Sequence, residues 1–426
     1  MPVCRKSLRY ALWDVFFFSL MVGAGESYLP AYALSVGMSE WLTGLFATVP
    51  LMSGALIQMI SPWALYHVGS VKKWVVGTGY LQALTFVPLF YFSLFPTNHF
   101  LWLFLIAAIY WGASFASAPM WNYWMNQLVP KDEAENFFAL RHKIGQVGVL
   151  IGLVGGGLAL HLKLQVGPFT SVFSTLFLIA FVCRLSSSYF LSLKREWKST
   201  PDHRPDVSEI FALWKKPSYR RFFGFLFLFN VMVYISAPFV TPYFLEKLHL
   251  DYNGYMLSIA SLLVAKILVM PFAGKLMKKY GVKRVFYWGA LGIAPIPALW
   301  PLSQDLYFVM TLQAISGAFW GLFEVALTVT FFNQIKPKQK ILILTVYNFF
   351  NAGAVILGSL AAGQVLKFFN ASFFSYAVIF VSGAVLRCLV AGVYFYKVRN
   401  SENLLDEEVD PIQAQPESFP VPAKTG

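Results

Sequence analysis

Long apolar segments alternate with short polar ones along the whole chain of 426 residues. A helix that crosses the hydrocarbon core of a bilayer needs about 20 apolar residues. At that length the pattern predicts an all-α membrane protein with about twelve transmembrane helices, arranged as two six-helix bundles. The predicted spans are residues 11–36, 40–66, 74–95, 100–128, 142–162, 168–193, 222–246, 252–277, 285–302, 306–333, 341–366 and 371–396. The first apolar segment is long and no small-residue cleavage site follows it, so we expect a retained helix rather than a signal peptide.

The basic residues are distributed unevenly between the predicted loops. If the amino terminus, every second loop and the carboxyl tail share one side, 27 of the 33 Lys and Arg residues lie on that side. Three lie in the opposite loops and three inside the spans. Because cytoplasmic loops are enriched in Lys and Arg, we expect both termini to be cytoplasmic, in a cell membrane, with the bacterial cytoplasmic (inner) membrane favoured. The net charge of +13 then reports orientation rather than a nucleic-acid partner.

Composition excludes most other classes of protein. The chain is 58% hydrophobic and 12% charged, with a mean hydropathy of +0.60, whereas soluble domains are about 45–50% apolar and about 25% charged. A soluble enzyme, a disordered regulator, a collagen-like fibre and a nucleic-acid-binding domain are therefore poor fits. The three cysteines, Cys4, Cys183 and Cys388, indicate no disulfide framework.

The longest polar interruption, residues 194–221, falls near the middle of the chain. It predicts a cytoplasmic linker between an N-terminal bundle, residues 1–193, and a C-terminal bundle, residues 222–397. Residues 398–426 are acidic and then rich in proline, a composition typical of a disordered cytoplasmic tail.

A weak internal repeat supports the two halves. NQLVPK at 126–131 returns as NQIKPK at 333–338, an offset of 207, and Arg184 returns as Arg387, each ten residues before a lysine. Three small residues spaced four apart also recur at an offset of 206: Gly148, Gly152 and Gly156 correspond to Ala354, Gly358 and Ala362. Small residues at this spacing permit close helix packing, which we expect here between the halves rather than around a ligand.

The loop between spans eight and nine, GKLMKKYGVKRV at 274–285, resembles the signature loop of the major facilitator superfamily. The matching positions, which the resemblance identifies with conformational change, are Gly274, Lys279, Gly281, Lys283 and Arg284. The corresponding loop of the first half keeps Gly69, Lys72 and Lys73. Lys278 stands at the acidic position of the signature and the first-half loop has no acid, so this chain departs from the family's acidic latch.

Two further segments carry the resemblance across the chain. SAPFVTPYFLEKL at 236–248, with two prolines, resembles the broken seventh helix of many family members, and residues 119–141 resemble a fourth helix and loop of bacterial members of unassigned substrate. Drug/proton antiporter and sugar-porter signatures are missing. The resemblance implies a transporter fold in which helices one, four, seven and ten line a central cavity.

Ionisable residues inside a membrane are costly and often functional. Glu26, Lys266 and Glu324 each lie within an apolar span and are our candidates for proton coupling. The depths of Lys266 and Glu324 differ by only about 3 Å, which predicts an ion pair, either structural or functional. Glu26 has no evident partner, and a carboxyl group in a low dielectric retains its proton more readily, which suits proton carriage or a cationic substrate but also a neutral structural carboxyl.

Three other charged residues near the span ends are interpreted as structural. We expect Asp14 to cap a helix or to face water near the cytoplasmic end. Arg184 and Arg387 lie near that end on helices that the resemblance makes peripheral, so we expect both to snorkel toward the membrane surface.

Polar and aromatic residues on the presumed cavity helices are substrate candidates. Aromatic rings near a carboxylate could hold an amphipathic or cationic organic molecule, although rings are common throughout this chain. The candidates are Tyr28, Tyr32, Trp111, Asn122, Asn126, Asn230, Tyr234, Gln313 and Trp320, with Trp121 and Trp124 nearby.

The favoured function is secondary active transport of a small organic solute by alternating access, coupled to protons, by a monomer in the bilayer. One alternative is an integral-membrane lipid-modifying enzyme, but the six histidines are scattered without metal-ligand or acid/base spacing. Another is a non-transporting receptor with the same fold. We expect no enzymatic activity, catalytic residues, metal, cofactor or nucleic-acid partner, and no Walker motif indicates ATP.

Overall fold

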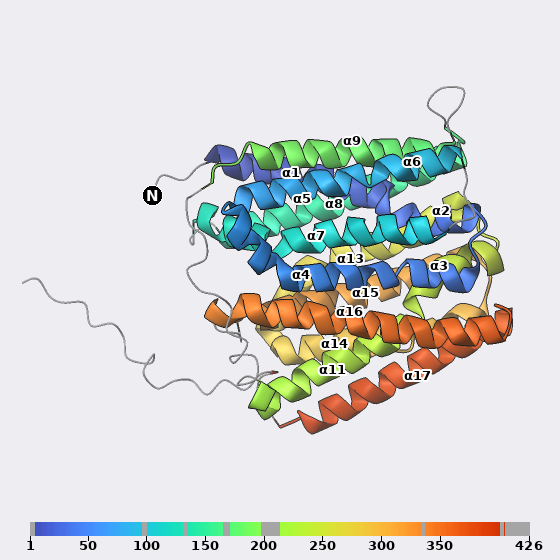
Figure 1. The fold of residues 1–426 in the computed structure, drawn as a ribbon. Helices are drawn as coiled ribbons and strands as arrows, with labels where there is room; N and C mark the ends of the chain where they lie inside the picture. Colours follow the sequence, from blue (N-terminus) through green and yellow to red (C-terminus); the bar gives the residue numbers. More distant parts are fainter. Residues whose placement is uncertain are drawn as a thin grey trace, which may run out of the picture.

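The helices run side by side, with their connections gathered at two ends (Figure 1). The computed structural model describes residues 5–95, 100–130, 134–164, 171–196, 214–333, 337–400 and 404. In these residues twelve helical segments are long and apolar enough to cross a membrane, which confirms the predicted all-α architecture. Most of the predicted tail, and most of the predicted linker including residues 197–213, lie outside the described residues.

The N-terminal half forms the upper layer of Figure 1. Its helices are α1 (Arg5–Ala24), η1 (Glu26–Tyr28), α2 (Leu29–Ser35), α3 (Glu40–Phe46), α4 (Val49–Val68), α5 (Val71–Leu84), α6 (Phe86–Leu94), α7 (Leu101–Leu128), α8 (Ala134–His161) and α9 (Val172–Ser192). Within this half α1 packs on α8 and α9, while α7 packs on α4 and α5.

The C-terminal half lies below it in the same view. Its helices are α11 (Pro217–Tyr234), η2 (Ala237–Phe239), α12 (Val240–Pro242), the π-helical turn η3 (Tyr243–Lys247), α13 (Tyr252–Tyr280), α14 (Val282–Ile293), η4 (Ile296–Leu302), α15 (Leu306–Asn333), α16 (Pro337–Phe368) and α17 (Phe373–Lys397). Helix α15 packs on α13 and α14, and α11 packs on α16 and α17. The halves meet where α8 contacts α13 and where α3 and α4 contact α16.

The seventh span is broken, as the resemblance predicted. Helix α11 ends at Tyr234, and Pro238 and Pro242 lie in the short 3₁₀ and α-helical pieces that follow. Proline has no amide N–H and cannot continue a regular helix. The first span is also broken, after Ala24, which the sequence analysis did not predict. Gly25 is required there, because a Cβ at this position would lie 2.6 Å from Ala180 Cβ and 2.9 Å from the Phe86 ring.

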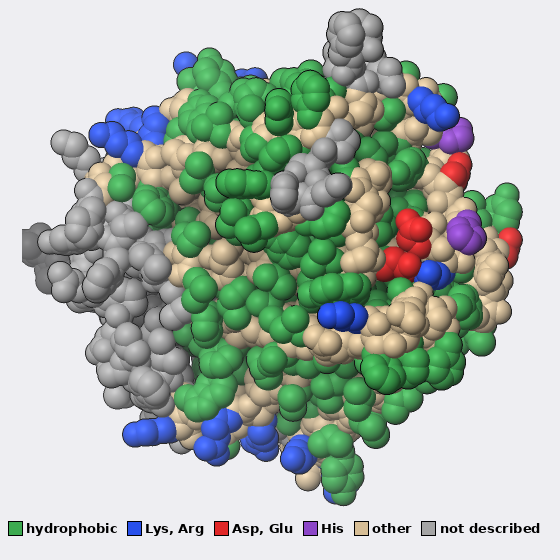
Figure 2. All heavy atoms as spheres, turned by 45° about the vertical axis from the view of Figure 1, so that its right-hand side comes forward, with side chains coloured by type: hydrophobic (Ala, Val, Ile, Leu, Met, Phe, Trp, Pro, Cys, Tyr) green, Lys and Arg blue, Asp and Glu red, His purple; other side chains and the backbone are tan. Residues whose placement is uncertain are grey.

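Charged side chains gather toward the two ends, and a broad apolar surface lies between them (Figure 2). We call the end where α1 begins and α17 ends the basic end, and the end where α2 and α3 meet the opposite end. The exposed apolar surface includes large side chains such as Leu101, Tyr307 and Phe374, each more than 60% exposed. Such a surface suits contact with lipid chains, and the chain is a multi-pass membrane protein.

The recurring small residues pack helices closely, but within each half rather than between halves. A Cβ at Gly148 would lie 2.8 Å from Ser19 Cβ, and one at Gly152 would lie 2.9 Å from the Ala24 nitrogen, both on α1. Gly358 of α16 meets α11 in the same way, with Tyr234 C at 2.9 Å. The expectation of packing between the halves was therefore wrong for these residues. The adjacent Gly157 does contact the other half, where it meets the Met256 side chain.

Candidate functional site

Lys266 of α13 and Glu324 of α15 form the ion pair that their matched depths predict. The Lys266 Nζ lies 2.6 Å from Glu324 Oε2 and donates a hydrogen bond of 2.8 Å to Oε1. The pair forms because α15 presents glycines to α13: a Cβ at Gly321 would lie 3.2 Å from the Lys266 carbonyl oxygen. The Lys266 side chain is 14% exposed and that of Glu324 is 41% exposed. Glu324 therefore remains accessible to protons and solutes while it is paired.

Titratable groups on three other helices lie within electrostatic range of this pair. His142 of α8 interacts electrostatically with both Lys266 and Glu324, and it comes from the other half of the molecule. Tyr234 of α11 and Tyr347 of α16 also interact with the Glu324 carboxylate. Sequence reasoning missed His142 and Tyr347, because nothing in the sequence indicates which face of a long apolar helix turns toward a distant carboxylate.

Glu26 lies at the break in the first span and is half-buried. The Tyr110 hydroxyl of α7 donates a hydrogen bond of 2.5 Å to Glu26 Oε2 and lies 3.3 Å from Met21 Sδ. The Tyr110 hydroxyl also interacts with the Gln82 side chain and with Arg184. Glu26 therefore has a partner after all, and that partner connects it to a chain of polar groups inside the N-terminal half.

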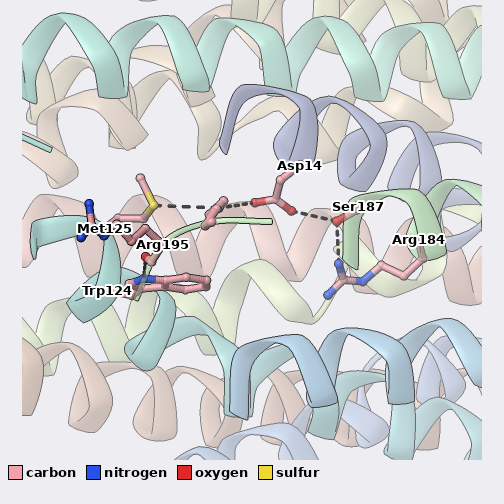
Figure 3. A network of polar contacts seen from close by, with 7 residues as sticks. Asp14, Trp124, Met125, Arg184, Ser187 and Arg195 are labelled. Carbon is pink, nitrogen blue, oxygen red and sulfur yellow. Dashed lines mark hydrogen bonds and ion pairs between the residues drawn. The ribbon is translucent and has the colours of Figure 1, made fainter. Parts of the chain in front are cut away.

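That chain continues to a buried charge network (Figure 3). Arg184 donates hydrogen bonds of 2.7 Å from Nε to Gln82 Oε1 and from Nη1 to Ser187 Oγ. The Ser187 hydroxyl donates to Asp14 Oδ1 at 2.8 Å, and Lys194 Nζ lies 3.1 Å from Asp14 Oδ2. Asp14, Arg184 and Lys194 are 4%, 3% and 0% exposed. The expectation that Asp14 caps a helix or faces water was wrong, because its carboxylate is the counterion of two buried cations.

Lys194 follows the end of α9, outside the sixth membrane span. Burial lowers the pKa of its ammonium group, and the Asp14 carboxylate opposes that shift. Sequence reasoning assigned this lysine to the linker, so it missed the network. Asp14 and Lys194 are 180 positions apart in the chain, so nothing in the local sequence indicates that they pair.

Neither of the two repeated arginines reaches the surface, so the expectation that they snorkel was wrong. Arg387 of α17 is 3% exposed. Its guanidinium donates hydrogen bonds to the carbonyl oxygens of Met232 and Val233, at 3.3 and 2.8 Å, and to the Ser236 hydroxyl. These groups lie where the seventh span is broken, so Arg387 supplies donors to backbone acceptors at the break. The Val233 carbonyl also accepts a hydrogen bond of 3.2 Å from the Ser236 amide.

The two halves are held together at the opposite end. Lys247 Nζ lies 2.8 Å from Glu40 Oε1, and the Tyr376 hydroxyl donates a hydrogen bond of 2.6 Å to Glu40 Oε2. Thr48 donates to Ser359 Oγ at 2.9 Å. These contacts join α3 and its extension to the C-terminal half. The sequence analysis did not single out Glu40, because at a span end it resembles an ordinary helix-starting acid.

The predicted cavity residues divide into three groups. Tyr234 interacts with Glu324, Asn230 interacts with the neighbouring Tyr347, and Trp320 packs edge-on against Phe323. In contrast, Tyr28 is buried with its hydroxyl bound to the Leu153 carbonyl, and Tyr32 is buried between Phe173 and Phe177. Among the remaining candidates, Trp111 contacts Tyr110 edge-on, Asn122 is exposed, Gln313 is buried, and the Asn126 side chain lies outside the described residues.

The signature loops lie at the basic end. Gly69 and Gly281 have φ angles of +66° and +85°, which favour glycine. In the first-half loop, Glu196 accepts hydrogen bonds from the Ser70 hydroxyl at 2.9 Å and the Lys72 amide at 3.0 Å. A carboxylate that follows α9 thus contacts the loop that lacks its own acid.

The other loop residues have separate environments. In the second-half loop Lys283 donates to the Val398 carbonyl at the end of α17, and Lys279 lies over the Tyr280 ring. Gly274 has open space around a Cβ position, Arg284 is exposed, and the Lys73 amide donates to Ser70 Oγ.

Comparisons with known proteins give a family model for the C-terminal half of the chain and several similar solved structures. A model of the Major Facilitator Superfamily matches residues 222–419. Among solved structures, a point mutant of the nucleoside transporter NupG is 14% identical with a TM-score of 0.72, and the match covers 92% of this chain and 99% of that one. A bacterial homologue of the human lysosomal transporter Spinster, inward-facing and occupied, is 14% identical with a TM-score of 0.73, covering 96% and 99%. No curated protein sequence matches the chain.

Proposed function

We propose that the chain is a member of the major facilitator superfamily and acts as a proton-coupled secondary active transporter rather than an enzyme. It moves a small organic solute across the cell membrane by alternating access, as a monomer. The observation that carries the proposal is the Lys266–Glu324 ion pair, which joins two membrane-spanning helices and includes a partly exposed carboxylate. Transporters of this kind bind substrate and coupling ions near the middle of the membrane.

The distribution of basic residues supports a cytoplasmic location for the basic end and for both termini. The described polar contacts between the halves include the Glu40 contacts with Lys247 and Tyr376 at the opposite end. With that end closed, the arrangement corresponds to an inward-facing form. The bundles of residues 1–193 and 222–397 would then rock about the central pair, joined by the linker at 194–221.

Proton coupling follows from the chemistry of the two carboxylates. Protonation of Glu324 removes the charge that holds Lys266, so the α13–α15 ion pair is lost and Lys266 must find another partner. Glu26 accepts a hydrogen bond from the Tyr110 hydroxyl of α7, and protonation of Glu26 would weaken this contact. Each half therefore contains one carboxyl group whose protonation state alters contacts between helices.

The test is solute flux in proteoliposomes that contain the purified full chain, with and without a pH gradient. Glu26→Gln and Glu324→Gln should abolish gradient-driven accumulation but retain solute exchange, since Gln keeps the shape of the protonated acid. The matched control is Glu246→Gln, an exposed acid at the opposite end, which should transport normally. Wild-type accumulation by both central variants would exclude these carboxylates from coupling, and lipid turnover without a gradient would favour the enzyme alternative.

A further inference from the structure

The turn that carries Glu26 is contacted from the other half of the molecule. The Tyr255 hydroxyl of α13 donates a hydrogen bond of 3.3 Å to the carbonyl oxygen of Ser27, the residue after Glu26. The Tyr255 ring also meets the Tyr28 ring edge-on, with centroids 6.1 Å apart. Tyr255 is 3% exposed, so the contact is sheltered from water. The coupling mechanism described above does not use it.

The same hydroxyl reaches the second helix break. The Thr241 hydroxyl lies 3.3 Å from Tyr255 Oη, and Thr241 belongs to α12, within the broken seventh span. Because a hydroxyl has one proton to donate and that of Tyr255 goes to Ser27, Thr241 is the donor in this contact. One side chain therefore joins the break in the first span to the break in the seventh.

The start of α13 packs against the N-terminal half around this tyrosine. The Met256 side chain lies against Gly157 of α8. Asp251, which precedes α13, has Oδ2 at 3.5 Å from His161 Nδ1 at the end of α8. Helix α8 ends and α13 begins at the opposite end of the molecule, where Glu40 also joins the halves. Closure of that end therefore brings Tyr255 against the turn that carries Glu26.

Glu26 is fixed by one contact from each half. Its carboxyl group accepts a hydrogen bond from Tyr110 of α7, and Tyr110 in turn interacts with Arg184 of α9. These groups belong to the same half as Glu26 and would move with it. Tyr255 belongs to the other half, so separation of the halves at the opposite end would break its hydrogen bond to Ser27. A change of conformation thus removes one of the two contacts.

We propose that Tyr255 is a positioning residue for Glu26. While the opposite end is closed, its hydroxyl holds the η1 turn and keeps the Glu26 carboxyl group against Tyr110. When that end opens, Tyr255 withdraws with α13, the turn relaxes, and Glu26 exchanges its proton with the aqueous space on that side. Tyr255 thereby links proton exchange at Glu26 to conformation. This inference rests on the proposed transport function and adds to it the residue that times proton exchange.

The test measures the accessibility of Glu26 to dicyclohexylcarbodiimide, an apolar reagent that modifies protonated carboxyl groups. The purified full chain in detergent is treated at one acidic pH, and mass spectrometry of the peptide that contains Glu26 gives the rate. Tyr255→Phe keeps the ring and removes the hydroxyl, so modification should be at least about threefold faster. Modification of Glu324 in the same sample should stay unchanged, since general loosening of the protein would raise both rates.

Tyr252→Phe is the matched control. Tyr252 lies on the same helix, and its ring also crosses to the N-terminal half, where it meets Phe173 edge-on. This variant should be modified at Glu26 as the wild type is, and Glu26→Gln, which lacks the reactive carboxyl group, identifies the signal. Thr241→Val removes the hydroxyl that orients Tyr255 and should give a smaller increase; it decides the question if Tyr255→Phe does not fold.

The link to conformation is tested with Glu40→Gln, which weakens the closed end by removing the charge opposite Lys247. Modification of Glu26 should rise in this variant too, because the halves separate more often. Adding Tyr255→Phe should then raise it little further, since both changes act through the same contact. Increases that simply multiply in the double variant would show that the Tyr255 hydroxyl acts independently of opening, and would contradict the proposal.

Two other results would overturn it: equal modification of Glu26 in Tyr255→Phe and Tyr252→Phe, including no modification in either, or rates that rise equally at Glu26 and Glu324. The assay needs neither solute nor gradient, so it separates the two proposals. Release of Glu26 by Tyr255→Phe, together with normal gradient-driven transport by Glu26→Gln, would retain Tyr255 as a positioning residue and reject proton coupling through Glu26. Coupling that depends on Glu26 without any effect of Tyr255→Phe would retain the transporter and reject this role of Tyr255.

Discussion

Arg184 of α9 and Arg387 of α17 occupy corresponding places in the two halves, and each is 3% exposed. The N-terminal half neutralises its arginine through Ser187 and the Asp14 carboxylate, which also binds Lys194. The C-terminal half uses the backbone carbonyls at the broken seventh span. The same buried cation is thus stabilised by a titratable network in one half and by fixed backbone dipoles in the other. Only the N-terminal network depends on a single carboxylate, that of Asp14.

The largest expected effect is the loss of that side chain. Asp14→Leu leaves Arg184 and Lys194 buried without their carboxylate, which should cost about 3–5 kcal/mol of stability. Thermal and denaturant unfolding in detergent would measure it. The double variant Asp14→Leu with Lys194→Met should recover part of the loss, because one stranded cation is removed. Wild-type stability in the single variant would contradict the network as a stabilising unit.

Removing the other arginine should cost less. Arg387→Leu replaces the cation with an apolar side chain and removes its hydrogen bonds to the Met232 and Val233 carbonyls, of which Val233 keeps the Ser236 amide as a donor. We expect a loss of about 1–3 kcal/mol. Ser236→Ala, which removes one acceptor and keeps the backbone contacts, is the milder control. A loss as large as that of Asp14→Leu would show that both halves depend on their charges equally.

The Lys266–Glu324 pair tests a carboxylate that is not fully buried. Because the Glu324 side chain is 41% exposed, either single substitution, Lys266→Glu or Glu324→Lys, should destabilise by only about 1 kcal/mol. The exchanged double variant should be more stable than both singles. Additive losses in the double variant would indicate that the two side chains act independently.

The last expected effect is a pH dependence of stability that comes from Lys194. Its folded-state pKa is lowered by burial, so between that pKa and the ordinary value of 10.5 the unfolded chain binds more protons than the folded one. Stability then rises with pH in this window, by less than about 1.4 kcal/mol per pH unit. Lys194→Met should show a flatter profile than the wild type, and identical slopes would exclude Lys194 as the source.

Sequence reasoning succeeded for features that depend only on the position of a residue along its helix. Span lengths, the prolines at 238 and 242, and the matched depths of Lys266 and Glu324 all follow from position along a helix. It failed where helix rotation decides the outcome. Tyr110 meets Glu26, and Asp14 meets Lys194, only because particular helix faces turn inward. Long spans that are apolar all round give no signal for that rotation. Arg184 and Arg387 were misplaced for the same reason.

The glycines between α1 and α8 have a mechanical consequence. Gly148 and Gly152 of α8 lie directly against α1. Because the two helices pack so closely, we expect them to move together as one rigid unit. In this unit α1 ends beside Glu26, and α8 contacts α13 of the C-terminal half. If α1 is displaced at the Glu26 end, we therefore expect α8 to move with it against α13, the helix that carries Lys266.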